Sequence, residues 1–115
     1  MGGMEDSPVR AKSFSFACDI ITFARALKEK KEYELASQLI RSGTGIGANI
    51  REAQRGVSRK DFSNKLGIAL KEADESLYWL ELIEATSNLE VKDLKHRCEE
   101  LIKMLVAIRK KTESI

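Results

Sequence analysis

The sequence predicts an all-α protein, folded as an antiparallel up-down-up-down four-helix bundle in a single domain. Apolar residues recur every three or four positions in four separate segments, which is the period of an amphipathic helix. No segment alternates apolar and polar residues as a half-buried strand does. A chain of 115 residues has room for one core, and its 33% of charged residues suit helices with one solvated side.

The first helix is predicted over residues 13–30, after a flexible segment over residues 1–12. Ile20, Ala24 and Leu27 form its apolar face. The stretch MGGMEDSPVRAK lacks the apolar centre of a secretory signal, and no run reaches the roughly 18 apolar residues of a membrane span. We therefore expect a cytoplasmic protein with no membrane partner.

The second helix is predicted over residues 33–55, although it contains the glycine run RSGTGIGANIREAQRG. This run satisfies the letter of the dinucleotide fingerprint G-x-G-x-x-(G/A), but that motif must follow a β-strand. The residues before it show helical spacing instead, and Leu39, Gly43, Ile46 and Ile50 continue the period through the run. The glycines are therefore expected inside a helix that another helix approaches closely, with a local kink as the alternative or additional use.

The third helix is predicted over residues 59–87 and the fourth over residues 90–112. Gly56 is a natural C-cap for the second helix, and Ser58 is a natural N-cap for the third. The links between helices are short, which favours antiparallel neighbours. The stripe of the fourth helix contains Val91, Leu94, Cys98, Leu101, Leu105 and Ile108.

The second half of the third helix is apolar around nearly its whole circumference. A helix of this kind must be buried on more than one side. We expect the apolar surface that the bundle does not need for its own core to contact another copy of the chain. The alternative is that this surface is buried in the chain's own core. The residues predicted at this homo-oligomer interface are Gly43, Gly47, Tyr78, Trp79, Leu82 and Ile83.

Candidate catalytic and metal-binding residues are few. His96 is the only histidine, and although Asp93 precedes it by three residues, a di-iron bundle needs two such pairs. Cys18 and Cys98 lie far apart and supply fewer ligands than a structural zinc site uses, so they are expected to be reduced core residues. We predict no enzyme, with no catalytic residue, metal ligand or cofactor.

The charged residues are unevenly distributed, although the net charge is only +2. In an up-down-up-down bundle, the start of the first helix, the link between the second and third, and the end of the fourth share one end. This end holds nine basic residues against three acidic ones, whereas the far end holds five against seven. We name this end the basic pole, defined by Arg10, Lys12, Arg51, Arg55, Arg59, Lys60, Arg109, Lys110 and Lys111.

All members of the basic pole except Arg10 and Lys12 are predicted to bind nucleic acid. Such a surface could hold the phosphate backbone of RNA or DNA without reading its bases. The alternative is that these residues favour helix C-termini and solubility. Aromatic side chains that would stack on single-stranded bases are expected to be absent from this end.

The stretch YELASQLIRSGTGIGANIREAQ, followed by SRKDFSNKLGIALKEADESLYWLELIEAT, resembles a family of four-helix-bundle proteins encoded in 23S rRNA intervening sequences. The resemblance covers residues 14–110 and is most specific over residues 45–53 and 78–80. Members often have proline where this chain has Gly47, so its second helix should bend less. The resemblance implies a four-helix bundle that forms a homo-oligomer, a pentameric ring, and no established reaction.

A related group, the accessory variability proteins of diversity-generating retroelements, works with a reverse transcriptase and RNA. Two hypotheses follow for this chain. One is a non-enzymatic homo-oligomeric accessory protein that binds RNA through the basic pole, and it predicts steeply salt-dependent binding. The alternative is a protein-protein interaction scaffold with no nucleic-acid ligand, which predicts weak salt dependence and a protein partner recovered by pull-down.

Overall fold

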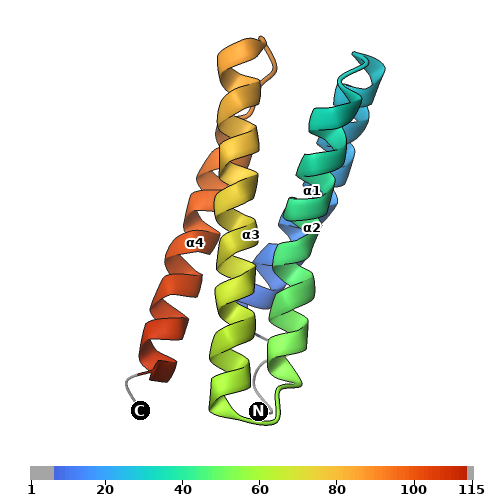
Figure 1. Ribbon diagram of the computed structural model, residues 1–115. Coiled ribbons are helices and arrows are strands. Elements are labelled where there is room, and N and C mark those ends of the chain that lie inside the picture. Colours follow the sequence, from blue (N-terminus) through green and yellow to red (C-terminus); the bar gives the residue numbers. More distant parts are fainter. Residues whose placement is uncertain (1–6, 114–115) are drawn as a thin grey trace.

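The computed structural model describes residues 7–113, which form four antiparallel helices in one domain (Figure 1). The helices are α1 (Pro8–Glu29), α2 (Tyr33–Gln54), α3 (Arg59–Thr86) and α4 (Lys92–Glu113). No strand occurs within residues 7–113. Helix α2 packs against both α1 and α3, while α4 packs mainly against α3 and less extensively against α1. The predicted all-α bundle is confirmed.

Helix α1 begins at Pro8, five residues before the predicted start at residue 13. Ser7 is its N-cap, and the Ser7 hydroxyl accepts a hydrogen bond from the Arg10 backbone N–H at 3.2 Å. Proline suits the first helical position because its φ is already close to the helical value. Residues 8–12 are therefore helical rather than flexible, whereas residues 1–6 of the predicted flexible segment lie outside the described residues.

The links between helices are closed by local hydrogen bonds. Ser58 is the N-cap of α3 as predicted, and its hydroxyl accepts from the Asp61 backbone N–H at 3.1 Å. The C-cap of α2 is Arg55 rather than the predicted Gly56, which follows it with an ordinary negative φ. Within residues 7–113 the only residue with a positive φ is Lys31, which turns the chain from α1 into α2.

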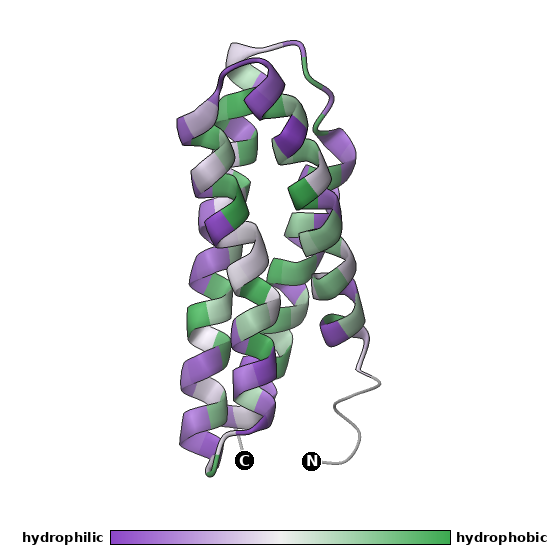
Figure 2. Cartoon of the chain, turned by 90° about the vertical axis from the view of Figure 1, so that its right-hand side faces the viewer, coloured by the Kyte–Doolittle hydropathy of each residue, from purple (hydrophilic) through white to green (hydrophobic). Residues whose placement is uncertain are grey.

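The core follows the bundle axis, where the four apolar stripes meet. Figure 2 shows apolar segments recurring along every helix between polar ones. Cys98 is buried there, where its thiol donates to the Ala73 carbonyl at 3.2 Å and burial raises its pKa to about 12. Cys18 is exposed on α1, contrary to the expectation that both cysteines lie in the core. The largest fully buried side chains include Phe16, Ile20, Leu27, Leu39, Ile46, Ile50, Leu66, Leu80, Leu101 and Leu105.

The glycine run lies in regular helix within α2, and other helices pack closely over it. A Cβ at Gly43 would lie 2.8 Å from Ile20 Cγ2 on α1, and one at Gly47 would lie 3.3 Å from Ser13 Oγ, also on α1. The expectation of close helix packing at these glycines is confirmed. The helix that covers Gly43 and Gly47 is α1 of the same chain. Because Gly43 is buried there, its predicted place at a homo-oligomer interface is wrong.

Candidate nucleic-acid interface

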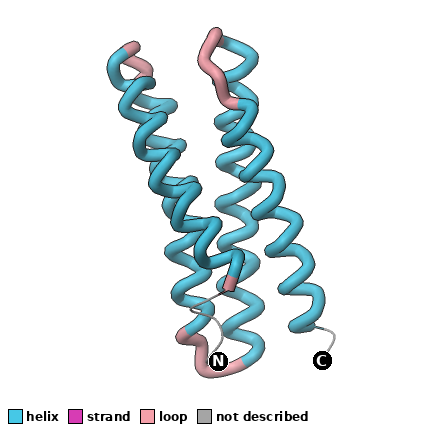
Figure 3. The backbone as a smooth tube through the Cα atoms, turned by 180° about the vertical axis from the view of Figure 1, so that it is seen from behind, coloured by secondary structure: helices cyan, strands magenta, loops and turns pink. Residues whose placement is uncertain are grey.

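One end of the bundle holds the first turn of α1, the link between α2 and α3, and the last turn of α4 (Figures 1 and 3). The antiparallel topology therefore brings the members of the basic pole to the same end. Their surroundings differ, however, and the contacts of each determine what it can still bind. Three of them surround the α2–α3 link: Arg55, Arg59 and Lys60.

Arg55, Arg59 and Lys60 all have exposed side chains. Arg59 and Lys60 are the first two residues of α3, where the helix dipole adds positive potential. Helix N-termini of this kind attract phosphate. The α2–α3 link therefore combines exposed positive side chains with the positive end of a helix dipole.

Arg51 lies at the side of the basic pole, next to the aromatic side chain of Phe14. Its guanidinium carbon lies 5.5 Å from the ring centroid of Phe14, which is within reach of a cation–π interaction. Phe14 is 58% exposed. The expectation that aromatic side chains are absent from this end is therefore wrong. Phe14 lies in the second turn of α1, beside the last turns of α2.

Arg109 is engaged by α3 rather than extended into solvent. Its Nε donates to the Ser63 carbonyl at 3.1 Å and lies 3.6 Å from the Glu113 carboxylate. The guanidinium lies over Gly67, where a Cβ would come within 2.9 Å of its Cζ. These contacts place Arg109 between α3 and α4, in a space that exists only because α3 has no side chain at Gly67, and its predicted role in binding nucleic acid stays a prediction.

Some of the remaining members of the basic pole are exposed, and others contact side chains of the same chain. Lys110 and Lys111 are exposed at the end of α4. Lys12 forms an ion pair with Glu100 at 3.1 Å, and Arg10 donates to the side-chain carbonyl of Gln54. Lys12 is nevertheless exposed, as is Arg51, so only Arg10 and Arg109 among the members of the basic pole are partly buried.

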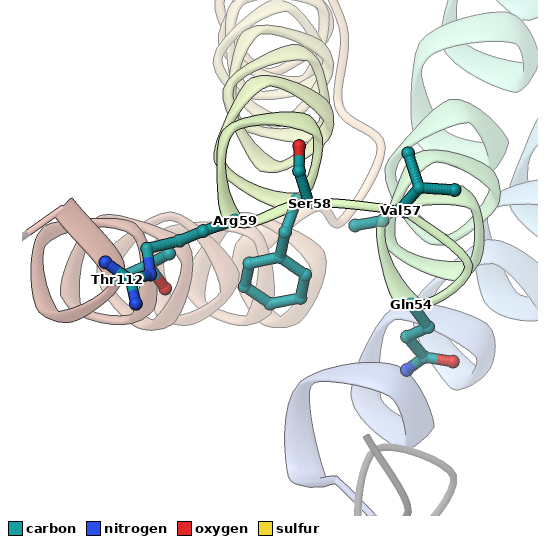
Figure 4. A pocket seen from close by; sticks show the side chains of 8 residues that line it. Gln54, Val57, Ser58, Arg59 and Thr112 are labelled. Atoms are coloured by element: carbon teal, nitrogen blue, oxygen red, sulfur yellow. The ribbon is translucent and has the colours of Figure 1, made fainter. Parts of the chain in front are cut away.

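A pocket of about 420 Å³ opens at the basic pole between the end of α2, the start of α3 and the end of α4 (Figure 4). Ala53 and Phe62 are buried and give it an apolar inner wall. Lys60 lines a second depression beside it, and Arg55 lines a third. The remaining residues that line the main pocket are Gln54, Gly56, Val57, Ser58, Arg59 and Thr112.

The predicted homo-oligomer residues on α3 divide between the core and the surface. Ile83 is 1% exposed and belongs to the core stripe three residues after Leu80, so its predicted place in an outer patch is wrong. Trp79 and Leu82 are partly buried, and Trp79 packs against the core. Tyr78 is 53% exposed, with its ring centroid 5.2 Å from that of Trp79.

Two further features that bear on function in the described part of the chain are metal-binding groups and membrane-spanning helices. Residues 7–113 contain no group of three or more His, Cys, Asp or Glu side chains that could hold a metal ion. His96 is exposed on α4. Within these residues, no helix is long and apolar enough to cross a membrane.

A family model described as 23S rRNA-intervening sequence protein matches residues 5–107. The chain belongs to this family. It is also similar to a solved protein of unknown function from the S23 ribosomal protein family of Bacteroides thetaiotaomicron VPI-5482, with 44% identity and a TM-score of 0.86. That similarity covers 89% of this chain and 98% of the other. No curated protein matches the sequence.

The family resemblance noted from the glycine run and the Tyr78-Trp79-Leu80 cluster is thus confirmed. The solved relative is itself of unknown function. The relatives therefore establish the fold of this chain, and its surface chemistry must support any assignment of function.

Proposed function

We propose that this protein is a non-enzymatic, homo-oligomeric accessory protein that binds the phosphate backbone of RNA through the basic pole. The observation that carries the proposal is the exposed cluster of Arg55, Arg59 and Lys60 at the α2–α3 link. Lys110 and Lys111 are exposed at the same end.

A polyphosphate chain suits this surface better than a single small anion. Exposed basic side chains come from separate segments, among them α4 and the α2–α3 link, so a ligand with repeated negative charges can contact several of them. Contacts of this kind hold the backbone and do not read sequence. Several copies in a homo-oligomer would multiply the attraction, because each copy adds its own basic pole.

Binding to RNA is expected to be steeply salt-dependent. Each neutralised phosphate releases condensed counterions, and added salt opposes this release. A protein that contacts several phosphates therefore loses affinity on the order of a hundredfold when the salt rises from about 50 to 200 mM. Fluorescence anisotropy with a labelled single-stranded RNA at a series of salt concentrations measures this slope. No binding at the lowest salt concentration, or an affinity that does not change with salt, contradicts the proposed function.

A protein-protein scaffold is the second candidate function, and one observation favours it. Val57 lies at the α2–α3 link with 93% of its surface exposed, in the middle of the basic cluster. An apolar side chain so placed suits a protein partner as well as a nucleic acid. Under this alternative, a protein partner is recovered by pull-down and its binding depends weakly on salt.

The homo-oligomer in this proposal uses the outer face of α3. Tyr78 is half exposed, and Leu82 lies one turn further along the same helix. Adjacent apolar side chains of this size form the kind of patch that often marks a protein contact. If this patch meets a different surface on the next copy, the contact is heterologous and closes into a ring when the rotation fits.

Changing Tyr78 and Leu82 together to glutamate is expected to yield helical monomers. Neither residue belongs to the fully buried core, so the bundle should keep its circular dichroism spectrum while the charges block contact between copies. Light scattering coupled to size exclusion measures the mass. The matched control, Tyr33→Glu with Val106→Glu, also places two charges at exposed apolar positions and should leave the oligomer intact. A monomeric wild-type protein at high concentration contradicts the assembly.

A further inference from the structure

The pocket at the basic pole differs in chemistry from the basic residues around it. Its inner wall is apolar, because Ala53 and Phe62 lie there, and its volume of about 420 Å³ is within the range of ligand pockets. Figure 4 shows side chains from the end of α2, the link and α4 around one opening. A phosphate group alone gains nothing from an apolar wall, so the pocket fits an occupant with an apolar body.

The rim of the pocket offers both a hydrogen-bond donor and a hydrogen-bond acceptor. The Ser58 hydroxyl oxygen accepts from the Asp61 backbone N–H, which leaves its O–H available as a donor. The Thr112 hydroxyl donates to the Ile108 carbonyl at 2.8 Å, which leaves its oxygen available as an acceptor. An apolar wall with a donor and an acceptor at its edge matches a flat ring that carries polar atoms on its perimeter.

The basic residues stand where they would contact charges attached to such a ring. Arg59 lines the pocket and also, together with Lys60, lines the adjoining depression. Arg55 lines a further depression on the α2 side of the link. A ring that enters the pocket with a phosphate on either side therefore meets apolar contact, polar contact and positive charge in the same place.

We propose that this pocket accepts one unpaired nucleobase of a single-stranded nucleic acid while the flanking phosphates lie on Arg59 and Lys60. In a single strand the faces and edges of the bases are accessible, whereas a duplex hides them. The inference rests on the proposed function and goes beyond it, because backbone binding alone does not distinguish single strands from duplexes.

The test compares three ligands of equal length by fluorescence anisotropy: a single-stranded RNA, the same sugar–phosphate strand without bases, and the duplex. The wild-type protein is expected to bind the intact single strand about tenfold more tightly than the other two, because contact with a base adds to the backbone attraction. Thr112→Leu fills the pocket from α4 with an aliphatic side chain and should abolish this preference. A DNA strand of the same sequence shows which sugar the basic pole prefers, and the same dependence on bases is expected for it.

The matched control is Val106→Leu, which introduces the same residue at an exposed position of α4 outside the pocket and should keep the preference. Equal wild-type affinity for strands with and without bases overturns the pocket assignment but leaves backbone binding intact. A preference that survives in Thr112→Leu, with unchanged circular dichroism, also overturns it. Absence of binding to every strand at low salt instead contradicts the proposed function itself.

Discussion

Gly43→Leu is expected to lower the free energy of unfolding by about 3 kcal/mol, because it overpacks the contact between α1 and α2. Even the first carbon of a side chain at this position would lie 2.8 Å from Ile20 Cγ2. Ile20 is fully buried and branched at Cβ, so it has few other conformations with which to make space. The two helices must therefore separate. Urea unfolding followed by circular dichroism measures the loss.

Gly47→Leu is the matched control for this prediction. Gly47 is one turn further along α2, is only partly buried, and its Cβ would lie 3.3 Å from Ser13 Oγ. The same substitution there is expected to cost about 1 kcal/mol, because the added side chain can extend toward solvent. Equal losses at the two glycines, or no loss at Gly43, would show that close packing of α1 does not explain the glycine run.

Reversing Arg55, Arg59 and Lys60 together to glutamate is expected to lower RNA affinity at least about a hundredfold at low salt. The change replaces three positive charges with three negative ones at the centre of the proposed interface. All three side chains are exposed, so little packing is lost. Two of the new glutamates stand in the first turn of α3, where negative charge favours the helix. Anisotropy and circular dichroism on the same samples separate binding from folding.

The far end of the bundle provides a matched control, in which Lys28, Lys30 and Lys92 are changed to glutamate. Lys30 is the C-cap of α1, as Arg55 is of α2, and Lys92 begins α4, as Arg59 begins α3. The net charge changes by the same amount in both variants, so a general electrostatic effect would weaken both. An equal loss of affinity in the control would remove the basic pole from the proposed function.

The sequence contained a signal for the true start of α1 that its apolar periodicity did not reveal. The pair Ser7-Pro8 is an N-cap followed by proline at the first helical position, and Val9 begins the buried stripe. Because the N-terminal residues carry few apolar side chains, a search by periodicity begins the helix too late. Phe14 lies in α1 with either start, and its place beside Arg51 comes from the packing of α1 against α2.

The candidate site could be predicted only in part. Topology alone brings the basic residues of three separate segments to one end, so the basic pole follows from the order of the helices. The place of Arg109 between α3 and α4 does not follow, because it depends on the absence of a side chain at Gly67 on another helix. The apolar pocket does not follow either, since its wall joins Ala53, Phe62 and Thr112 from three helices.

By itself the sequence determined the four helices, their antiparallel order and the residues that form the core stripe, because a period of 3.6 residues is a local property of the chain. Only the tertiary structure decided which neighbour covers each remaining face. Gly43 faces α1 whereas Gly45, two residues later, faces Glu72 on α3, and Ile83 joins the core while Tyr78 remains exposed. A helix that carries apolar or small residues on several faces can be buried in more than one way. The packing angles of its neighbours select one of these arrangements.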